Sequence, residues 1–152
     1  QRSRRYNRPL SAMMLDFDNF KTINDTYGHA VGDQVLVEVA EYCTKALRVI
    51  DIQGRYGGEE LAFLLPETTN TGARQVAERL RQGIVDLVIM VKGHRLNITA
   101  SIGVASFDTS SPSMEDFLMR SDKALYEAKR NGRNRVCAFL DIQVSPPSSD
   151  EI

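Results

Sequence analysis

Two adjacent glutamates, Glu59 and Glu60, follow a glycine pair, Gly57 and Gly58, within residues 55–61. Carboxylate oxygens are the hard ligands that Mg²⁺ prefers in proteins. A glycine pair between two extended segments predicts a tight two-residue hairpin turn, and we expect positive φ angles in it. Glycine also lets a ligand approach the backbone closely. The stretch therefore predicts a turn that binds a phosphate or a metal ion, and a solvated hairpin end is the alternative for these residues taken alone.

A second group of carboxylates, Asp16 and Asp18, ends an apolar run at residues 10–15. Such a run is typical of a strand that is buried on both faces. Aspartate is a favoured N-cap, so we expect Asp18 to cap the short helix that follows, with Lys21 in its first turn. Asp16 has no such structural role. If its strand lies beside the glycine hairpin, Asp16 joins the two glutamates as carboxylates do when they share metal ions in phosphoryl transfer.

The remaining pattern predicts the elements that position these groups. Apolar residues recur with helical or alternating spacing along most of the chain, and residues 24–29 have the composition of a loop. We expect helices at 31–50, at 71–83 and after a capping box at Ser113 and Asp116, paired strands at 51–56 and 61–65 and at 87–91 and 96–107, and an edge strand at 136–140. This order predicts an α+β domain whose mixed, largely antiparallel central sheet is flanked by helices.

Composition narrows the classes of partner. The chain of 152 residues carries 19 basic and 20 acidic residues, and its net charge of −1 gives no overall attraction to a polyanion. We therefore expect no nucleic-acid partner and no direct membrane contact from this domain. Cys43 and Cys137 lack metal-ligand spacing, so we expect two buried free thiols, which suit a reducing cytoplasm.

Several motifs, in order from about Pro9 to Phe139, resemble the GGDEF family of diguanylate cyclases. The matching stretches are residues 16–21, 24–30, 32–33, 55–61, 124–126 and 132–134, with Asp122 and Lys129. Glu59 and Leu61 depart from the residues in the family's name, but glutamate is a usual variant and leucine stays apolar. The resemblance implies a fold like the palm of nucleotide cyclases and polymerases, and the condensation of two GTP into cyclic di-GMP with release of pyrophosphate.

The resemblance also implies a metal site. It makes Asp16, the Phe17 carbonyl and Glu59 ligands of two Mg²⁺ ions, with Mn²⁺ as an alternative ion and Glu60 as a further ligand. Glu59 is in addition the implied base for the attacking ribose 3′-hydroxyl. The implied catalytic residues are therefore Asp16, Glu59 and Glu60.

Substrate contacts follow from the same resemblance. Asn24 and Asp33 match the positions that bind guanine, and a carboxylate suits guanine because it accepts from both N1–H and the exocyclic amino group. The alternative for Asp33 is an exposed residue near a helix N-terminus. His29 matches a substrate contact, or it stabilises its loop by hydrogen bonds. Phosphate contacts are implied for Lys21, Lys129, Arg133, Gly57 and Gly58. The two cations after the last helix also complement its dipole.

An Arg-x-x-Asp element, Arg48 and Asp51, has the spacing of the family's inhibitory site for its product. Arginine binds guanine O6 and N7 bidentately, and aspartate accepts from the opposite edge. Arg79 is a further expected contributor from the next helix. An ordinary ion pair is the alternative for the first two residues.

These implications predict a cytoplasmic diguanylate cyclase, or the cytoplasmic portion of a larger sensor, that needs a homodimer because one chain holds half of the reaction centre. Its expected ligands are GTP as substrate and cyclic di-GMP as product and inhibitor. The alternative is a catalytically idle module that binds GTP or cyclic di-GMP. We expect residues 1–8 to be the remnant of a linker from a missing N-terminal region, 9–140 to be the catalytic domain, and 141–152 to be a disordered tail.

Overall fold

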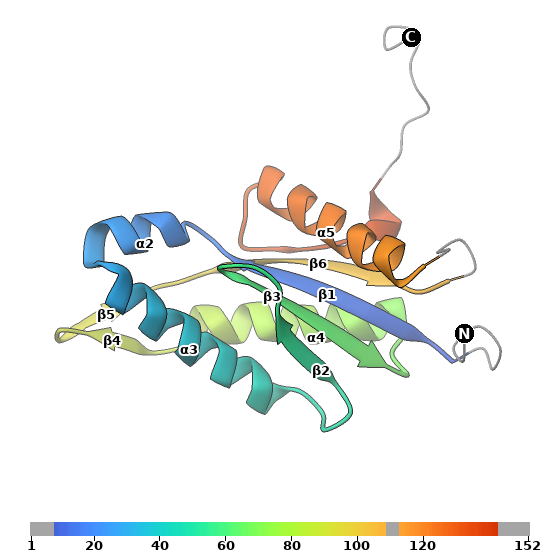
Figure 1. Ribbon diagram of the computed structural model, residues 1–152, viewed down its shortest axis with the longest axis horizontal. Coiled ribbons are helices and arrows are strands. Elements are labelled where there is room, and N and C mark those ends of the chain that lie inside the picture. The colour runs from blue at the N-terminus through green and yellow to red at the C-terminus, as the bar shows by residue number, and fades with distance from the viewer. Residues whose placement is uncertain (1–7, 109–112, 143–152) are drawn as a thin grey trace, which may run out of the picture.

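A five-stranded sheet forms the centre of the computed structural model, which describes residues 8–108 and 113–142 (Figure 1). The strand order is β2-β3-β1-β6-β7. All neighbouring strands are antiparallel except β6 and β7, which are parallel. The strands are β1 (Leu10–Phe17), β2 (Ile52–Arg55), β3 (Glu60–Pro66), β6 (Ala100–Ser106) and β7 (Val136–Ala138). The predicted α+β fold with a mixed, largely antiparallel sheet is confirmed.

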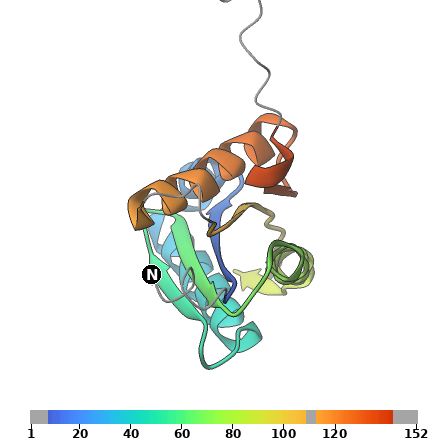
Figure 2. The ribbon, with the colours of Figure 1, turned by 90° about the vertical axis from the view of Figure 1, so that its right-hand side faces the viewer.

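Helices cover both faces of this sheet. Helices α3 and α4 lie against one face and α5 lies against the other (Figures 1 and 2). A short hairpin of β4 and β5 extends beyond the sheet. The bounds are α2 (Phe20–Tyr27), α3 (His29–Ala46), α4 (Asn70–Asp86), β4 (Ile89–Val91), β5 (His94–Leu96), α5 (Met114–Arg130) and a 3₁₀ turn, η1 (Phe139–Asp141). No helix in the described ranges is both long and apolar enough to span a membrane.

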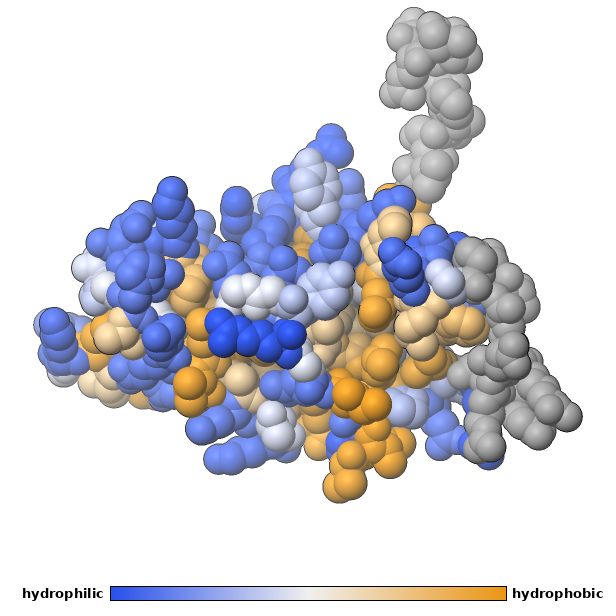
Figure 3. Space-filling view, viewed as in Figure 1, coloured by the Kyte–Doolittle hydropathy of each residue, from blue (hydrophilic) through white to orange (hydrophobic). Residues whose placement is uncertain are grey.

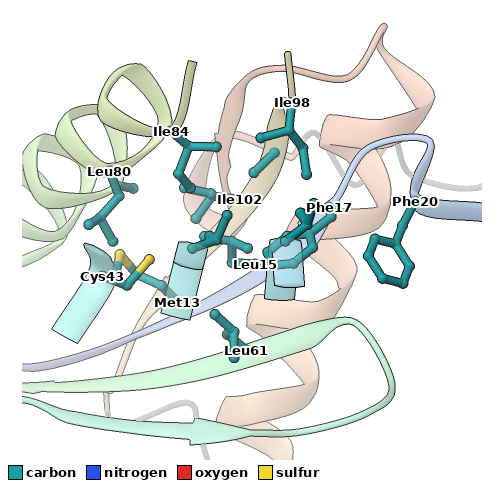
Figure 4. Packing of buried hydrophobic residues seen from close by; sticks show 14 of the residues in the cluster. Met13, Leu15, Phe17, Phe20, Cys43, Leu61, Leu80, Ile84, Ile98 and Ile102 are labelled. Atoms are coloured by element: carbon teal, nitrogen blue, oxygen red, sulfur yellow. The ribbon is translucent and has the colours of Figure 1, made fainter. Parts of the chain in front are cut away.

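Side chains of the central strand β1 alternate between the two layers, as the pleat of a strand requires. Met13, Leu15 and Phe17 belong to the larger core with α3 and α4, and Figure 4 shows Leu80 of α4 in this cluster. Ala12 faces α5 and packs with its residue Phe117. Asp16 is four residues after Ala12, an even number, so its side chain lies on the same face of the sheet, the one covered by α5.

Several predicted boundaries differ from the structure. Helix α2 includes residues 24–27, which were expected to form a loop, because Phe20 and Ile23 bury one side of that turn. Helix α3 ends at Ala46 rather than near Ile50. The expected strand at 96–107 is divided: β5 pairs with β4, whereas β6 joins the central sheet. The capping prediction is confirmed for Ser113, whose hydroxyl accepts from the Asp116 N–H at 3.0 Å.

The two cysteines and the chain end also test predictions. Cys43 is fully buried, and burial raises the pKa of its thiol to about 12, so it stays neutral at ordinary pH. Cys137 is also a free thiol, but it is only half-buried on the edge strand β7, so the expectation of burial was wrong for it. Asp141 belongs to η1 and pairs with Arg74, so it is not part of a disordered tail. Residues 1–7 and 143–152 lie outside the described residues.

Candidate active site

The carboxylates predicted to converge do so because β1 and β3 are neighbours. Asp16 is directly opposite Glu60 in the antiparallel register of these strands. Glu59 is the last residue before β3. Three acidic side chains from two distant parts of the sequence therefore lie at one end of the sheet.

The connection that carries Glu59 is longer than predicted. Strand β2 ends at Arg55 and β3 begins at Glu60, so residues 56–59 form the loop in place of a two-residue turn. Neither Gly57 nor Gly58 has a positive φ, which corrects our expectation. The Arg55 guanidinium shapes the loop instead, because it donates to the carbonyls of both glycines, at 3.3 Å to Gly57 and 2.6 Å to Gly58. These carbonyl groups are thereby turned toward Arg55.

The carboxylates share one nearby cation. The Lys129 ammonium at the end of α5 lies 2.6 Å from Oδ2 of Asp16. Burial, followed by the negative charge of Asp16, raises the pKa of both Glu59 and Glu60. Burial also raises the pKa of Asp16, although the hydrogen bond and charge of Lys129 oppose this shift. One ammonium thus offsets only part of the charge of three carboxylates.

The same residues fit a divalent cation. Oδ1 of Asp16 is buried and accepts no hydrogen bond, which is costly for a carboxylate oxygen unless a ligand occupies it. Acidic oxygens of this kind suit Mg²⁺. In the described ranges no three acidic, histidine or cysteine side chains are close enough together to form a complete metal cluster as they stand. The second oxygen of Asp16 is instead paired with Lys129.

The predicted guanine-binding residues come from α2 and α3, and their contact depends on Gly32. A Cβ atom on Gly32 would lie 1.9 Å from Oδ1 of Asn24, so any larger residue there would displace the Asn24 amide from this position. That amide oxygen is buried and accepts no hydrogen bond. Asp33 follows Gly32 and is exposed, as is His29 at the start of α3. Asn24 thus lies against the residue that precedes Asp33 in α3, and its buried amide oxygen lacks a hydrogen-bond partner.

A hollow of about 220 Å³ lies between helix α3 and the connection from β2 to β3, which carries Glu59. Leu36, Val37 and Ala40 of α3 form its apolar wall, and Glu59 and Glu60 line its other side. Positions three and four residues apart share a helix face, so the wall continues the face of α3 that begins at Asp33. An apolar wall suits the flat base of a nucleotide, and the acidic groups beside it suit the phosphates only through metal ions bound between them.

The remaining predicted phosphate ligands are less closely gathered. Lys21 is exposed in the first turn of α2, and Arg133 is exposed in the turn after α5. Of the predicted cations, Lys129 is the one that contacts a carboxylate of the site in the described structure. Lys21 lies at the start of α2, and Arg133 lies in the turn that follows the end of α5 at Arg130.

The structure gives Asp18 a different role from the predicted helix cap. Asn19 occupies the cap position of α2, with φ of 56° and no side-chain cap bond. Asp18 is only 3% exposed, and its carboxylate accepts hydrogen bonds from Thr99, Ser101 and the N–H of Asn134. These partners are 81, 83 and 116 residues away, so no local pattern in the sequence could indicate them.

The predicted inhibitory pair forms a closed contact. The Arg48 Nη2 atom lies 2.7 Å from Oδ1 of Asp51, whose side chain is only 2% exposed. The same nitrogen donates to the Pro66 carbonyl and to Oγ1 of Thr68, each at 2.8 Å. The pair borders a hollow of about 420 Å³. Arg79 contacts the Ala46 carbonyl at 3.4 Å and does not line this hollow.

Exposed apolar side chains occur in the chain segment that lines this hollow, and one of them, Val49, borders it. Val49 is fully exposed, and Ile50 and Ile52 are about half exposed. Apolar residues gather on this lower part of the molecule in Figure 3. Patches of this kind often mark binding surfaces.

A mixed sheet with acidic groups at neighbouring strand ends, next to a hollow, is an arrangement suited to metal-assisted phosphoryl chemistry. The family model described as "Diguanylate cyclase, GGDEF domain" matches residues 1–135. The chain therefore belongs to the GGDEF family.

Curated relatives agree with this membership. Diguanylate cyclase A of Treponema denticola is 50% identical over 127 residues, which cover 84% of this chain and 34% of the relative. The response regulator PleD of Caulobacter vibrioides is 42% identical over 130 residues, or 84% of this chain and 29% of that protein. The chain thus spans about a third of the length of these relatives.

Solved structures agree as well. The GGDEF domain of DgcB from Caulobacter crescentus, solved in complex with c-di-GMP, superposes with a TM-score of 0.87 at 31% identity, covering 92% of this chain and 83% of that one. The active GGEEF domain of a diguanylate cyclase from Vibrio cholerae gives a TM-score of 0.84 at 38% identity, with coverages of 91% and 87%.

Proposed function

We propose that this domain is a diguanylate cyclase that condenses two GTP molecules into cyclic di-GMP and two pyrophosphates. The observation that carries the proposal is the meeting of Asp16, Glu59 and Glu60 at one end of the sheet, where Lys129 binds Asp16. Membership of the GGDEF family and the relatives named as diguanylate cyclases support it.

In this reaction the guanine base binds between α2 and α3. The Asn24 and Asp33 side chains face its donors and acceptors, and the selectivity for guanine over adenine comes from the Asp33 carboxylate. His29 lies at the start of α3 and supplies a further contact. Lys21, Lys129, Arg133 and the loop of Gly57 and Gly58 hold the phosphates.

Glu59 accepts the proton of the attacking ribose 3′-hydroxyl. Two Mg²⁺ ions, or Mn²⁺ in their place, held by Asp16, the Phe17 carbonyl, Glu59 and Glu60, would neutralise the phosphates and polarise the α-phosphate. The burial and mutual repulsion that raise the pKa of Glu59 bring it closer to the basicity that a proton acceptor needs at neutral pH.

The reaction requires two copies of the domain. Each domain binds one GTP in the α3 hollow, and the 3′-hydroxyl of each nucleotide attacks the α-phosphate of the other. Two domains must therefore face one another as a homodimer. We also place the protein in the cytoplasm, because its two thiols are free and a reducing compartment suits them.

Purified protein incubated with Mg²⁺ and GTP should form cyclic di-GMP, with two pyrophosphates released per product. Chromatography of the nucleotides and a pyrophosphate assay measure both. The rate per protein should rise with protein concentration, since the active species is a dimer. Protein that binds GTP at high concentration but makes no cyclic dinucleotide would instead be the idle binding module.

We further propose that cyclic di-GMP inhibits the enzyme at Arg48 and Asp51. Arg48→Ala should raise the product concentration that halves the rate by at least about tenfold, because a charged hydrogen-bonding partner of guanine is lost. Initial rates measured with added cyclic di-GMP give this value. Arg74→Ala, which removes an exposed arginine on α4, is the matched control.

Because Arg48 also supports the local structure, a second variant is needed. Thr68→Val removes one acceptor of the Arg48 guanidinium but leaves Arg48 and Asp51 in place. It should keep the inhibition, whereas a loss as large as that of Arg48→Ala would make Arg48 a structural residue only.

A further inference from the structure

Asp18 is a buried carboxylate that the proposed reaction does not use. Its Oδ1 accepts from the Ser101 hydroxyl at 2.6 Å, and its Oδ2 accepts from the Thr99 hydroxyl at 2.7 Å and from the N–H of Asn134 at 2.9 Å. No lysine or arginine pairs with it in the described structure. A buried carboxylate with this set of neutral donors is a structural junction, since each donor is held by a charge-assisted hydrogen bond.

The junction connects three segments. Thr99 and Ser101 lie just before and within β6, whereas Asn134 lies in the turn between α5 and β7. In Figure 1 this turn comes beside the segment that leads from β1 to α2. Asp18, two residues after Asp16, thus binds this turn directly through the Asn134 N–H.

The turn needs such an anchor because its backbone is strained. Gly132, Arg133 and Asn134 have φ angles of 125°, 64° and 46°. The left-handed region costs a residue with a side chain about 1 kcal/mol or more. The Arg133 N–H donates to the Ala128 carbonyl at 3.0 Å, and Arg81 of α4 donates to the Asn134 side chain at 2.7 Å. With Asp18, these bonds hold Arg133 in one backbone conformation.

We propose that Asp18 is a positioning residue of the nucleotide site: through the Asn134 N–H, it fixes the turn that presents Arg133 to the triphosphate. This inference rests on the proposed function. Asp18 itself touches neither the nucleotide nor the metal ions. Its effect is on the affinity for the triphosphate, whereas the carboxylates around Asp16 act on the chemical step.

Asp18→Asn is the main test, because it keeps the size of the side chain, removes its charge and replaces one acceptor oxygen with an NH₂ group that cannot accept. The hydrogen bonds that a neutral acceptor keeps are roughly half as strong. Amide hydrogen exchange at Asn134 should become about tenfold faster while the β1 core stays protected. The dissociation constant for 3′-deoxy-GTP with Mg²⁺, which binds but lacks the attacking hydroxyl, should rise by about fivefold to tenfold. Asp18→Ala should have larger effects in the same direction.

Ser101→Ala is the matched control. It removes one donor to Asp18 on the β6 side and leaves the Asn134 bond in place. It should lower the melting temperature but leave the affinity for 3′-deoxy-GTP within about twofold of wild type. An equal loss of affinity in Ser101→Ala and Asp18→Asn would reduce Asp18 to a general stabiliser.

The path through Arg133 is tested in a double variant. Asp18→Asn should add little loss of affinity to Arg133→Ala, because the group that it positions is already gone. The proposal is overturned if Asp18→Asn lowers the affinity of the Arg133→Ala protein as much as it lowers that of wild type. It is also overturned if Asp18→Asn speeds exchange at Asn134 but leaves the affinity for 3′-deoxy-GTP unchanged. Wild-type protein that binds 3′-deoxy-GTP but makes no cyclic di-GMP contradicts the proposed function alone, and wild-type protein that binds no analogue contradicts both.

Discussion

Replacing Glu59 with glutamine should lower kcat for cyclic di-GMP formation by at least about 100-fold, because a general base alone contributes about that much or more. Loss of a metal ligand adds to the effect. The side chain keeps its size, and burial already disfavours its charged form, as the raised pKa of Glu59 indicates. The variant should therefore fold and melt at or slightly above the temperature of the wild type. Product chromatography and thermal unfolding measure the two quantities.

Glu41→Gln is the control for the loss of one negative charge, since Glu41 is exposed on α3. It should retain wild-type turnover. If Glu59→Gln kept more than a tenth of the wild-type rate, neither the proton transfer nor an essential metal contact could be assigned to Glu59.

Gly103→Ala should destabilise the fold more than any surface change. A Cβ atom at this position of β6 would lie 2.1 Å from the Leu125 nitrogen and 2.2 Å from the Ser121 carbonyl oxygen, both in the backbone of α5. Overpacking of this kind costs about 3 kcal/mol, which lowers the melting temperature by about 10 °C in a domain of this size. If α5 moves away to relieve this clash, Lys129 moves away from Asp16 with it.

Gly54→Ala is the matched control, because Gly54 lies on the edge strand β2 and a Cβ atom there meets no atom within 4 Å. Its melting temperature should stay within about 2 °C of the wild type. A Gly103→Ala protein as stable as this control would show that α5 does not rest on β6 as closely as described.

The sequence was sufficient to predict the acidic end of the sheet. An apolar run that ends in Asp16 is a strand by its own pattern, and the segment after Glu60 is another. Once these strands are neighbours, their pairing brings the carboxylates together. The metal-binding and substrate roles assigned by family resemblance are predictions.

Other features depend on contacts that a linear pattern does not contain. Asp18 fits the local pattern of a helix cap, but its hydroxyl and amide donors come from β6 and from the turn after α5. Gly57 and Gly58 fit a two-residue turn, yet the side chain of Arg55 binds their carbonyls and supports a longer loop. For Asp18 long-range hydrogen bonds override the local preference, and for the glycine pair a nearby side chain does so.

The closed contact between Arg48 and Asp51 has a consequence for feedback control. A guanine that uses both groups must first separate them, and it must also take Arg48 from the Pro66 carbonyl and Thr68. The apparent affinity for the product is the intrinsic affinity multiplied by the fraction of molecules in which the pair is open. Under the proposed product inhibition, each 1.4 kcal/mol that favours the closed pair raises by about tenfold the concentration of cyclic di-GMP that halves the rate. The proposed feedback therefore depends on a corner of the fold where the carbonyl of Thr68 accepts from the Ser11 hydroxyl at the start of β1.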